Sequence, residues 1–217
     1  MQRLNALLPW INGHQTLLDI GTDHAELPIT AIQQKIVQKA YASDNKDGPL
    51  KVAKTRVIDA RLDHVIEVLK GDGFDALNRD VDVVVIAGIG GGQIGTMLQK
   101  GPWLNVKTII VQPTNKVSNV RQITQEIPWQ VSEEMITVDK GIPYISLKLT
   151  RGKRPLSQTD ILFGPDLLRQ KDPAYKALLH QDLAFLKTLL SQIPEHATPE
   201  SMRDKATMLE DILDDWT

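Results

Sequence analysis

Apolar residues in the first two-thirds of the chain form short, almost unbroken runs, separated by segments in which they recur at helical spacing. Runs of this length are typical of strands covered on both faces, as in a parallel sheet between two layers of helices. They predict strands within residues 16–21, 39–44, 64–73, 81–92 and 107–113. A final hairpin is expected over residues 129–151, with its turn at Lys140 and Gly141.

Strands that alternate with helices indicate βαβ units. Five such units closed by an antiparallel hairpin are the pattern of an α/β, Rossmann-like class I methyltransferase sheet, whereas a six-stranded dinucleotide-binding sheet follows another pattern. One predicted helix opens at Asp47, which is expected to act as its N-cap, with Pro49 in the first turn.

The C-terminal part has a different pattern. After Asp172-Pro173, and again after Thr198-Pro199, apolar residues recur at alternating steps of four and three. This heptad spacing predicts two helices that pack as an antiparallel hairpin, a short coiled coil. Its seam positions are Leu179, Leu183, Leu186, Leu190, Ile193, Met202, Ala206, Leu209, Leu213 and Trp216. The chain is therefore expected to comprise an α/β domain over residues 1–155 and a helical hairpin over residues 156–217.

Composition narrows the classes of protein. The chain has 217 residues and no cysteine, which excludes a disulfide framework and thiolate metal sites and favours a cytoplasmic location. The N-terminus has no signal-peptide cleavage pattern, and no apolar run approaches the ~18 residues of a membrane span. His14, His64, His180 and His196 lack the spacing of metal ligands, so no metal is expected.

Charge is divided unevenly along the chain. Up to Pro155 there are 19 basic and 16 acidic residues, and from Leu156 onward there are 6 basic and 11 acidic residues. Contacts with phosphates are therefore expected from the first part.

The candidate chemistry lies at the ends of the predicted strands, because ligands of open α/β sheets bind at the carboxyl ends of the strands. Gly21 ends the first strand and allows close backbone approach to a ligand, and it is bracketed by Asp19 and Asp23. Asp44 ends the second strand and suits the two hydroxyls of a ribose. Asp72 follows the third strand and could accept from an adenine amino group.

Two further features support a cofactor pocket. Phe74 would cover an apolar side of it, and the small residues after the fourth strand leave backbone bare for a ligand. Each turn by itself could be only structural, but their occurrence in strand order favours an adenosine cofactor. Acids around Gly21 suit a cationic donor such as S-adenosyl-L-methionine and would repel the pyrophosphate of a dinucleotide.

Three segments carry a family resemblance. "LLDIGTDHAELP" (17–28), "IAGIGGGQI" (86–94) and "VQPTNKVSNVR" (111–121) together resemble the TrmK type of bacterial tRNA (adenine-22 N1) methyltransferases, and the resemblance runs over nearly the whole chain. It implies that residues 1–155 form an S-adenosyl-L-methionine-binding domain and that the substrate is tRNA. The expected cofactor-binding residues are Asp19, Gly21, Thr22, Asp44, Asn45, Asp72, Gly73, Phe74, Ala87, Gly88, Ile89 and Gly90.

The resemblance and the chemistry of methyl transfer suggest roles for other residues. Asp23 is expected to stabilise the cationic product, His24 to orient cofactor or base, and Gln112 to contact the target base. RNA contacts are expected from Arg121, Lys148, Arg151, Lys153 and Arg154.

Two positions depart from the family pattern. Glu26 stands where a tyrosine is usual and Thr114 where an asparagine is common, although Asn115 could take over from the latter. A small-molecule methyltransferase and a non-catalytic module that binds adenosine cofactors stay open as alternatives. The sequence leaves the oligomeric state open, with a monomer favoured.

Overall fold

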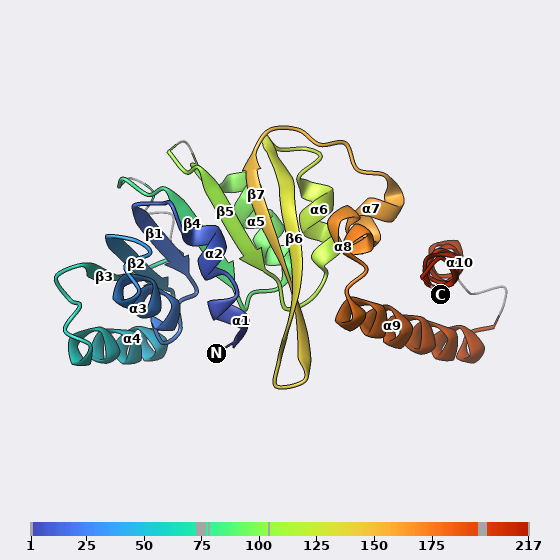
Figure 1. Cartoon of the computed structure of the whole chain (residues 1–217), viewed down its shortest axis with the longest axis horizontal. Helices are drawn as coiled ribbons and strands as arrows, with labels where there is room; N and C mark the ends of the chain where they lie inside the picture. The colour runs from blue at the N-terminus through green and yellow to red at the C-terminus, as the bar shows by residue number, and fades with distance from the viewer. Residues whose placement is uncertain (1, 73–76, 78, 104, 195–198, 217) are drawn as a thin grey trace.

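A computed structural model of the chain describes residues 2–72, 77, 79–103, 105–194 and 199–216. Its centre is a seven-stranded sheet with the order β3-β2-β1-β4-β5-β7-β6 (Figure 1). The strands are β1 (Thr16–Ile20), β2 (Lys39–Asp44), β3 (Ile66–Lys70), β4 (Val83–Ala87), β5 (Thr108–Gln112), β6 (Trp129–Asp139) and β7 (Ile142–Arg151). The first five are parallel and β7 is antiparallel to its neighbours, which confirms the class I methyltransferase sheet.

Helices cover both faces of this sheet. They are α1 (Gln2–Asn5), α2 (Leu8–Ile11), α3 (Glu26–Gln33), α4 (Asp47–Asp59), α5 (Gly91–Lys100) and α6 (Val117–Ile123). Apolar residues of α5 and α6 pack with one face of the strands, and those of α1 to α4 with the other. Burial on both faces explains the unbroken apolar runs of β1, β4 and β5.

The helix after β2 differs in one detail from the sequence-based expectation. Lys46 occupies the N-cap position and Asp47 is the first helical residue, so Asp47 is not the cap. An acid in the first turn still interacts favourably with the helix dipole.

The closing hairpin turns at Lys140 and Gly141, as predicted. Both residues have positive φ, 52° and 78°, which a two-residue type I′ hairpin turn requires. Thr108 at the start of β5 pairs with Thr150 near the end of β7. The chain therefore leaves β7 at the amino-terminal edge of the parallel strands, and the hairpin turn projects beyond their carboxyl ends (Figure 1).

The C-terminal part contains α7 (Gln158–Phe163), α8 (Pro165–Gln170), α9 (Pro173–Gln192) and α10 (Glu200–Asp214). Asp172 caps α9 as expected, because its carboxylate accepts from the Ala174 N–H at 2.7 Å. The cap predicted at Thr198 lies outside the described residues.

The predicted apolar seam joins α9 to α10. Leu179, Leu186, Ala206, Leu209 and Leu213 are buried in one cluster that also includes residues of α7, α8 and the β6–β7 hairpin. In Figure 1, α9 lies across the page while α10 is seen nearly end-on.

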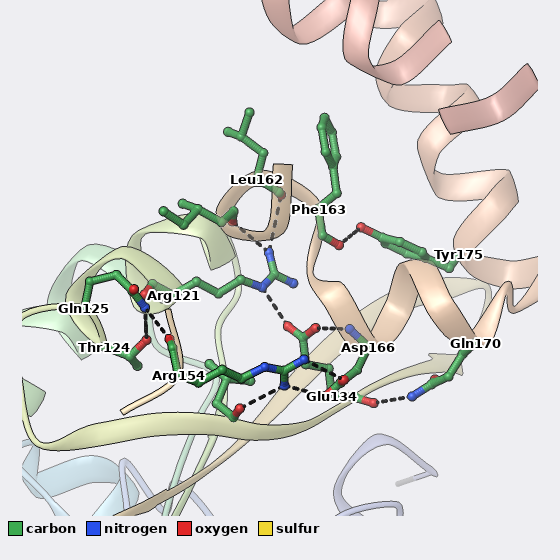
Figure 2. A network of polar contacts seen from close by, with 12 residues as sticks. Arg121, Thr124, Gln125, Glu134, Arg154, Leu162, Phe163, Asp166, Gln170 and Tyr175 are labelled. Carbon is green, nitrogen blue, oxygen red and sulfur yellow. Dashed lines mark hydrogen bonds and ion pairs between the residues drawn. The ribbon is translucent and has the colours of Figure 1, made fainter. Parts of the chain in front are cut away.

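A buried polar network joins this C-terminal part to the sheet domain (Figure 2). The Arg121 and Glu134 side chains, 1% and 0% exposed, form an ion pair of 2.6 Å, and the second carboxylate oxygen of Glu134 accepts from the Asp166 N–H. Asp166 also binds Arg154 and Arg169. These contacts join residues before position 155 to residues after it. The domain boundary at this position remains a prediction.

Candidate active site

A cavity of about 910 Å³ opens at the carboxyl ends of β1 to β4, where the sequence placed the ligand site. This volume is within the usual range for small-molecule sites, roughly 300–1,000 Å³. Of the residues predicted to bind the cofactor or act in catalysis, its lining includes Gly21, Asp23, Asp44, Asn45, Asp72, Ala87, Gly88, Ile89 and Gly90. Gly73 and Phe74 lie outside the described residues.

The backbone at the end of β1 needs a glycine. Gly21 has a φ of 75°, and a Cβ there would lie 3.1 Å from Cδ1 of Ile89, which lines the same cavity. A side chain at position 21 would therefore strain the turn and crowd the floor of the cavity.

Asp19 and Thr22 flank the turn at the end of β1, and both are buried and do not line the cavity. Asp19 is 5% exposed, and its Oδ2 accepts from the Thr22 hydroxyl at 2.7 Å. The pKa of Asp19 is raised to about 6, chiefly by burial and also by nearby Asp44, while the Thr22 hydrogen bond and Arg3 act in the opposite direction. The hydrogen bond between them fixes the turn, and Asp19 is mostly negatively charged above about pH 6.

We predict that Asp19 makes folding stability depend on pH. Its pKa is above the ordinary 3.8, so the folded protein holds this proton more tightly, and the free energy of unfolding falls as pH rises from 3.8 to about 6. Asp19→Asn keeps an oxygen acceptor for Thr22 and removes the titration. In urea unfolding at several pH values, the free energy of unfolding of the variant minus that of the wild type should increase by about 2 to 3 kcal/mol between pH 3.8 and about pH 6. A difference that stays constant with pH would contradict the assignment.

Asp23 and His24 stand at the rim of the site. Asp23 has a φ of 50° and a side chain that is 65% exposed, and its Oδ2 lies 3.4 Å from Nε2 of His24. Asp23 lines the cavity and His24 does not. The pair can therefore present a carboxylate, oriented by an imidazole, to a base that enters from solvent.

The loops after β2 and β3 supply two more acids. Asp44 lines the cavity beside Asn45, and its Oδ1 accepts from the Lys46 N–H at 2.9 Å, which fixes the carboxylate. Asp72 lines the same end. This is the arrangement expected for ribose and adenine recognition.

The loop after β4 is held against the loop after β5. A Cβ at Gly91 would lie 2.4 Å from the carbonyl oxygen of Lys116, and the Gly91 N–H donates to the Asn115 carbonyl. The Asn115 side chain lies against Gly90, and the Thr114 N–H donates to the Ile89 carbonyl. Asn115 is exposed beside the cavity, next to position 114, where an asparagine is common in the family.

Gln112 was expected to contact the target base, but its side chain is buried. It is 1% exposed, its Oε1 accepts from Nη1 of Arg3 at 3.0 Å, and its Nε2 donates to the Arg3 carbonyl and to Ser146 Oγ. Both amide hydrogens are therefore used, which does not fit a direct contact between Gln112 and a target base.

Several residues of the cavity wall were not predicted from the sequence. Arg3 comes from the N-terminal helix, Ile20 from the end of β1, Lys46 and Pro49 from the start of α4, and four more from α5. The α5 residues are Gln93, Thr96, Met97 and Lys100. Their spacing of three and four places them on one helix face, a signal the sequence carried.

The basic residues predicted to bind RNA are mostly used within the protein. Lys148 pairs with Glu133 at 2.7 Å, Arg154 pairs with Asp166, and the Arg151 guanidinium stacks on the Trp129 ring at 4.1 Å. Lys153 is exposed and donates to the Gln125 carbonyl. Because β7 is antiparallel, it ends beside the amino-terminal ends of the parallel strands, so residues 151–154 lie away from the cavity at their carboxyl ends.

Arg121 requires a correction. Its side chain is only 1% exposed and is held by Glu134 and by the carbonyls of Ile161 and Leu162 (Figure 2). An RNA contact through this guanidinium does not fit the structure, because the group does not reach the surface.

Glu26 begins α3, and its Oε1 is buried without a hydrogen-bond partner among the described residues. No group of three or more potential metal ligands occurs within the described ranges. No helix of the described part is both long and apolar enough to cross a membrane.

The strand order and the glycine- and acid-lined cavity at the ends of β1 to β4 define a Rossmann-like class I methyltransferase. Comparison with known proteins gives the family. Residues 17–214 match the family model "TrmK: tRNA (adenine(22)-N(1))-methyltransferase", and the chain belongs to this family.

Several relatives are similar over nearly the whole length. The tRNA (adenine(22)-N(1))-methyltransferase of Bacillus subtilis is 28% identical over 98% of this chain and 93% of its own. The crystal structure of the B. subtilis m1A22 tRNA methyltransferase TrmK has a TM-score of 0.83 at 28% identity, covering 99% of this chain and 96% of its own. A Streptococcus pneumoniae structure in complex with S-adenosyl-L-methionine has a TM-score of 0.90 at 28% identity and covers 98% and 99%.

Proposed function

We propose that this chain transfers a methyl group from S-adenosyl-L-methionine to N1 of adenine 22 in tRNA. The observation that carries the proposal is the extent of the family match, which includes both the cavity and the C-terminal helices α9 and α10. A tRNA substrate also implies that the protein works in the cytoplasm.

The cavity residues fit an adenosine-containing methyl donor. Asp44, with one oxygen fixed by the Lys46 N–H, has its other oxygen available for the ribose hydroxyls. Asp72 lines the cavity at the end of β3, where it would accept from the adenine amino group. Gly21, Gly88 and Gly90 leave room for the ligand against bare backbone. When bound, the donor would supply an electrophilic methyl group on a sulfonium.

The chain's own groups would position the base and balance its charge. Adenine N1 offers its lone pair only when the base is unpaired, so the nucleotide must leave its stack. The lone pair attacks the methyl carbon in line, the carbon–sulfur bond breaks with its electrons remaining on sulfur, and the adenine becomes cationic. Asp23 at the rim would stabilise that charge, with His24 holding the carboxylate.

The test is direct. Purified protein, unmodified bacterial tRNA and labelled S-adenosyl-L-methionine are combined, and the modified nucleotide is mapped by mass spectrometry. We expect one methyl group on N1 of adenine 22, and none on the same tRNA with guanosine at that position. Methylation elsewhere in the tRNA, or only of small molecules, would overturn the proposal.

Asp23→Asn tests the role at the rim. We expect turnover to fall about 100-fold, because the variant lacks the negative charge that opposes the cationic product. Binding of S-adenosylhomocysteine, measured by calorimetry, should stay close to wild type. Asp63→Asn, an exposed acid after α4, is the matched control. Wild-type turnover in Asp23→Asn would remove this residue from the mechanism.

A further inference from the structure

Arg3 of helix α1 lines the cavity and has no ion-pair partner in the described part of the structure. Its Nη1 donates to Gln112 Oε1, and its guanidinium lies 5.1 Å from the centroid of the Tyr144 ring. Both partners are neutral. Neither partner cancels the positive charge of Arg3, and the guanidinium also acts on buried Asp19, whose pKa it lowers.

The support behind Arg3 is buried and fully hydrogen-bonded. Gln112 is 1% exposed and Ser146 is 0% exposed, and the Gln112 amide joins Ser146 to both the side chain and the carbonyl of Arg3. The Arg3 N–H donates to the Asp139 carboxylate at 3.4 Å. Arg3 belongs to the four-residue helix α1 and is held in position by contacts with β5, β6 and β7.

The position of Arg3 relative to the acids of the cavity is informative. Nη2 of Arg3 lies 4.0 Å from where a Cβ of Gly88 would be, after β4, whereas Asp44 and Asp72 follow β2 and β3. In the strand order β3-β2-β1-β4-β5, the acids and the cation are at opposite ends of the cavity. Strands are spaced ~4.8 Å apart, so the end of β4 is about 10 Å from the end of β2 and about 14 Å from the end of β3.

We infer that Arg3 binds the carboxylate of the amino-acid part of the methyl donor and thereby positions its sulfonium. With the adenosine at the acids after β2 and β3, the amino-acid end points toward β4, β5 and Arg3. A guanidinium binds a carboxylate through two parallel hydrogen bonds, and a rigid cation costs little to organise at binding. Gln112 is then a positioning residue that acts through Arg3. The inference rests on the proposed function, since it needs this donor in the cavity.

The test compares two ligands by calorimetry on the full chain: S-adenosylhomocysteine and its decarboxylated analogue, which keeps the amine. We expect Arg3→Gln to lower the affinity for S-adenosylhomocysteine about 10- to 100-fold, because the charge-assisted contact with the carboxylate is lost. The affinity for the analogue should change less than twofold, because it has no carboxylate. Arg3→Lys should be intermediate. Arg61→Gln, exposed before β3 at the other edge of the sheet, should match the wild type.

Other outcomes would overturn the assignment in distinguishable ways. If Arg3→Gln weakens both ligands equally, Arg3 only shapes the cavity wall. If neither affinity changes but the KM for tRNA rises and its salt dependence becomes shallower by about one charge, the anion is an RNA phosphate and the carboxylate assignment is wrong. If the wild type itself fails to bind S-adenosylhomocysteine, the proposed function falls, and the inference falls with it.

Discussion

Arg121→Met should lower the free energy of unfolding by about 3 to 5 kcal/mol. The substitution leaves the Glu134 carboxylate, 0% exposed, with the Asp166 N–H but without its cation. It also removes the donors to the Ile161 and Leu162 carbonyls, so α7 loses this tie to α6. Urea or guanidinium unfolding measures the change.

An exposed pair provides the control. Arg79 and Glu67 form an ion pair whose side chains are 37% and 47% exposed, so Arg79→Met should cost less than ~1 kcal/mol. The double variant Arg121→Met/Glu134→Met should recover much of the lost stability, because no uncompensated charge remains. Equal losses in Arg121→Met and Arg79→Met would mean that the buried network does not join the two parts of the chain.

Asp44→Ala should weaken binding of S-adenosyl-L-methionine about 100-fold, measured by calorimetry. The carboxylate is held by the Lys46 N–H and faces the cavity, and each charge-assisted hydrogen bond to a ribose hydroxyl contributes about 1.5–3 kcal/mol. Asp47→Ala is the matched control, because that acid is 83% exposed, pairs with Lys70 and does not line the cavity. Unchanged affinity in Asp44→Ala would exclude the ribose contact.

The sheet and the cavity floor could be predicted because their signals are local. Strands β1, β4 and β5 are buried on both faces, and the turns after β1 to β4 each carry a glycine or an acid that is visible in the sequence. The heptad seam was equally local, since it identifies residues such as Leu186 and Leu209 that face the core. The angle at which α10 crosses α9 depends on packing against α7, α8 and the hairpin, and spacing alone does not determine it.

The residues that were missed or misplaced depend on contacts between distant segments. Helix α1 has four residues, too few to show periodicity, and Arg3 reaches the cavity through a partner 109 residues away. Arg121 looked like an exposed cation because Glu134, its neutralising partner, lies in another element. Arg151 and Lys153 were predicted to contact RNA because they cluster with other basic residues at the end of the last strand, but the antiparallel direction of β7 places that strand end away from the cavity.

The way Arg3 is held has a consequence for how the protein is made on the ribosome. Its first anchor, Gln112, emerges 109 residues later, which at 5–20 residues per second corresponds to roughly 5 to 20 s of translation. Ser146, which completes the anchor, emerges later still. Arg3 must wait without these anchors through that interval, so the cavity gains its last wall only when nearly all of the sheet has been synthesised.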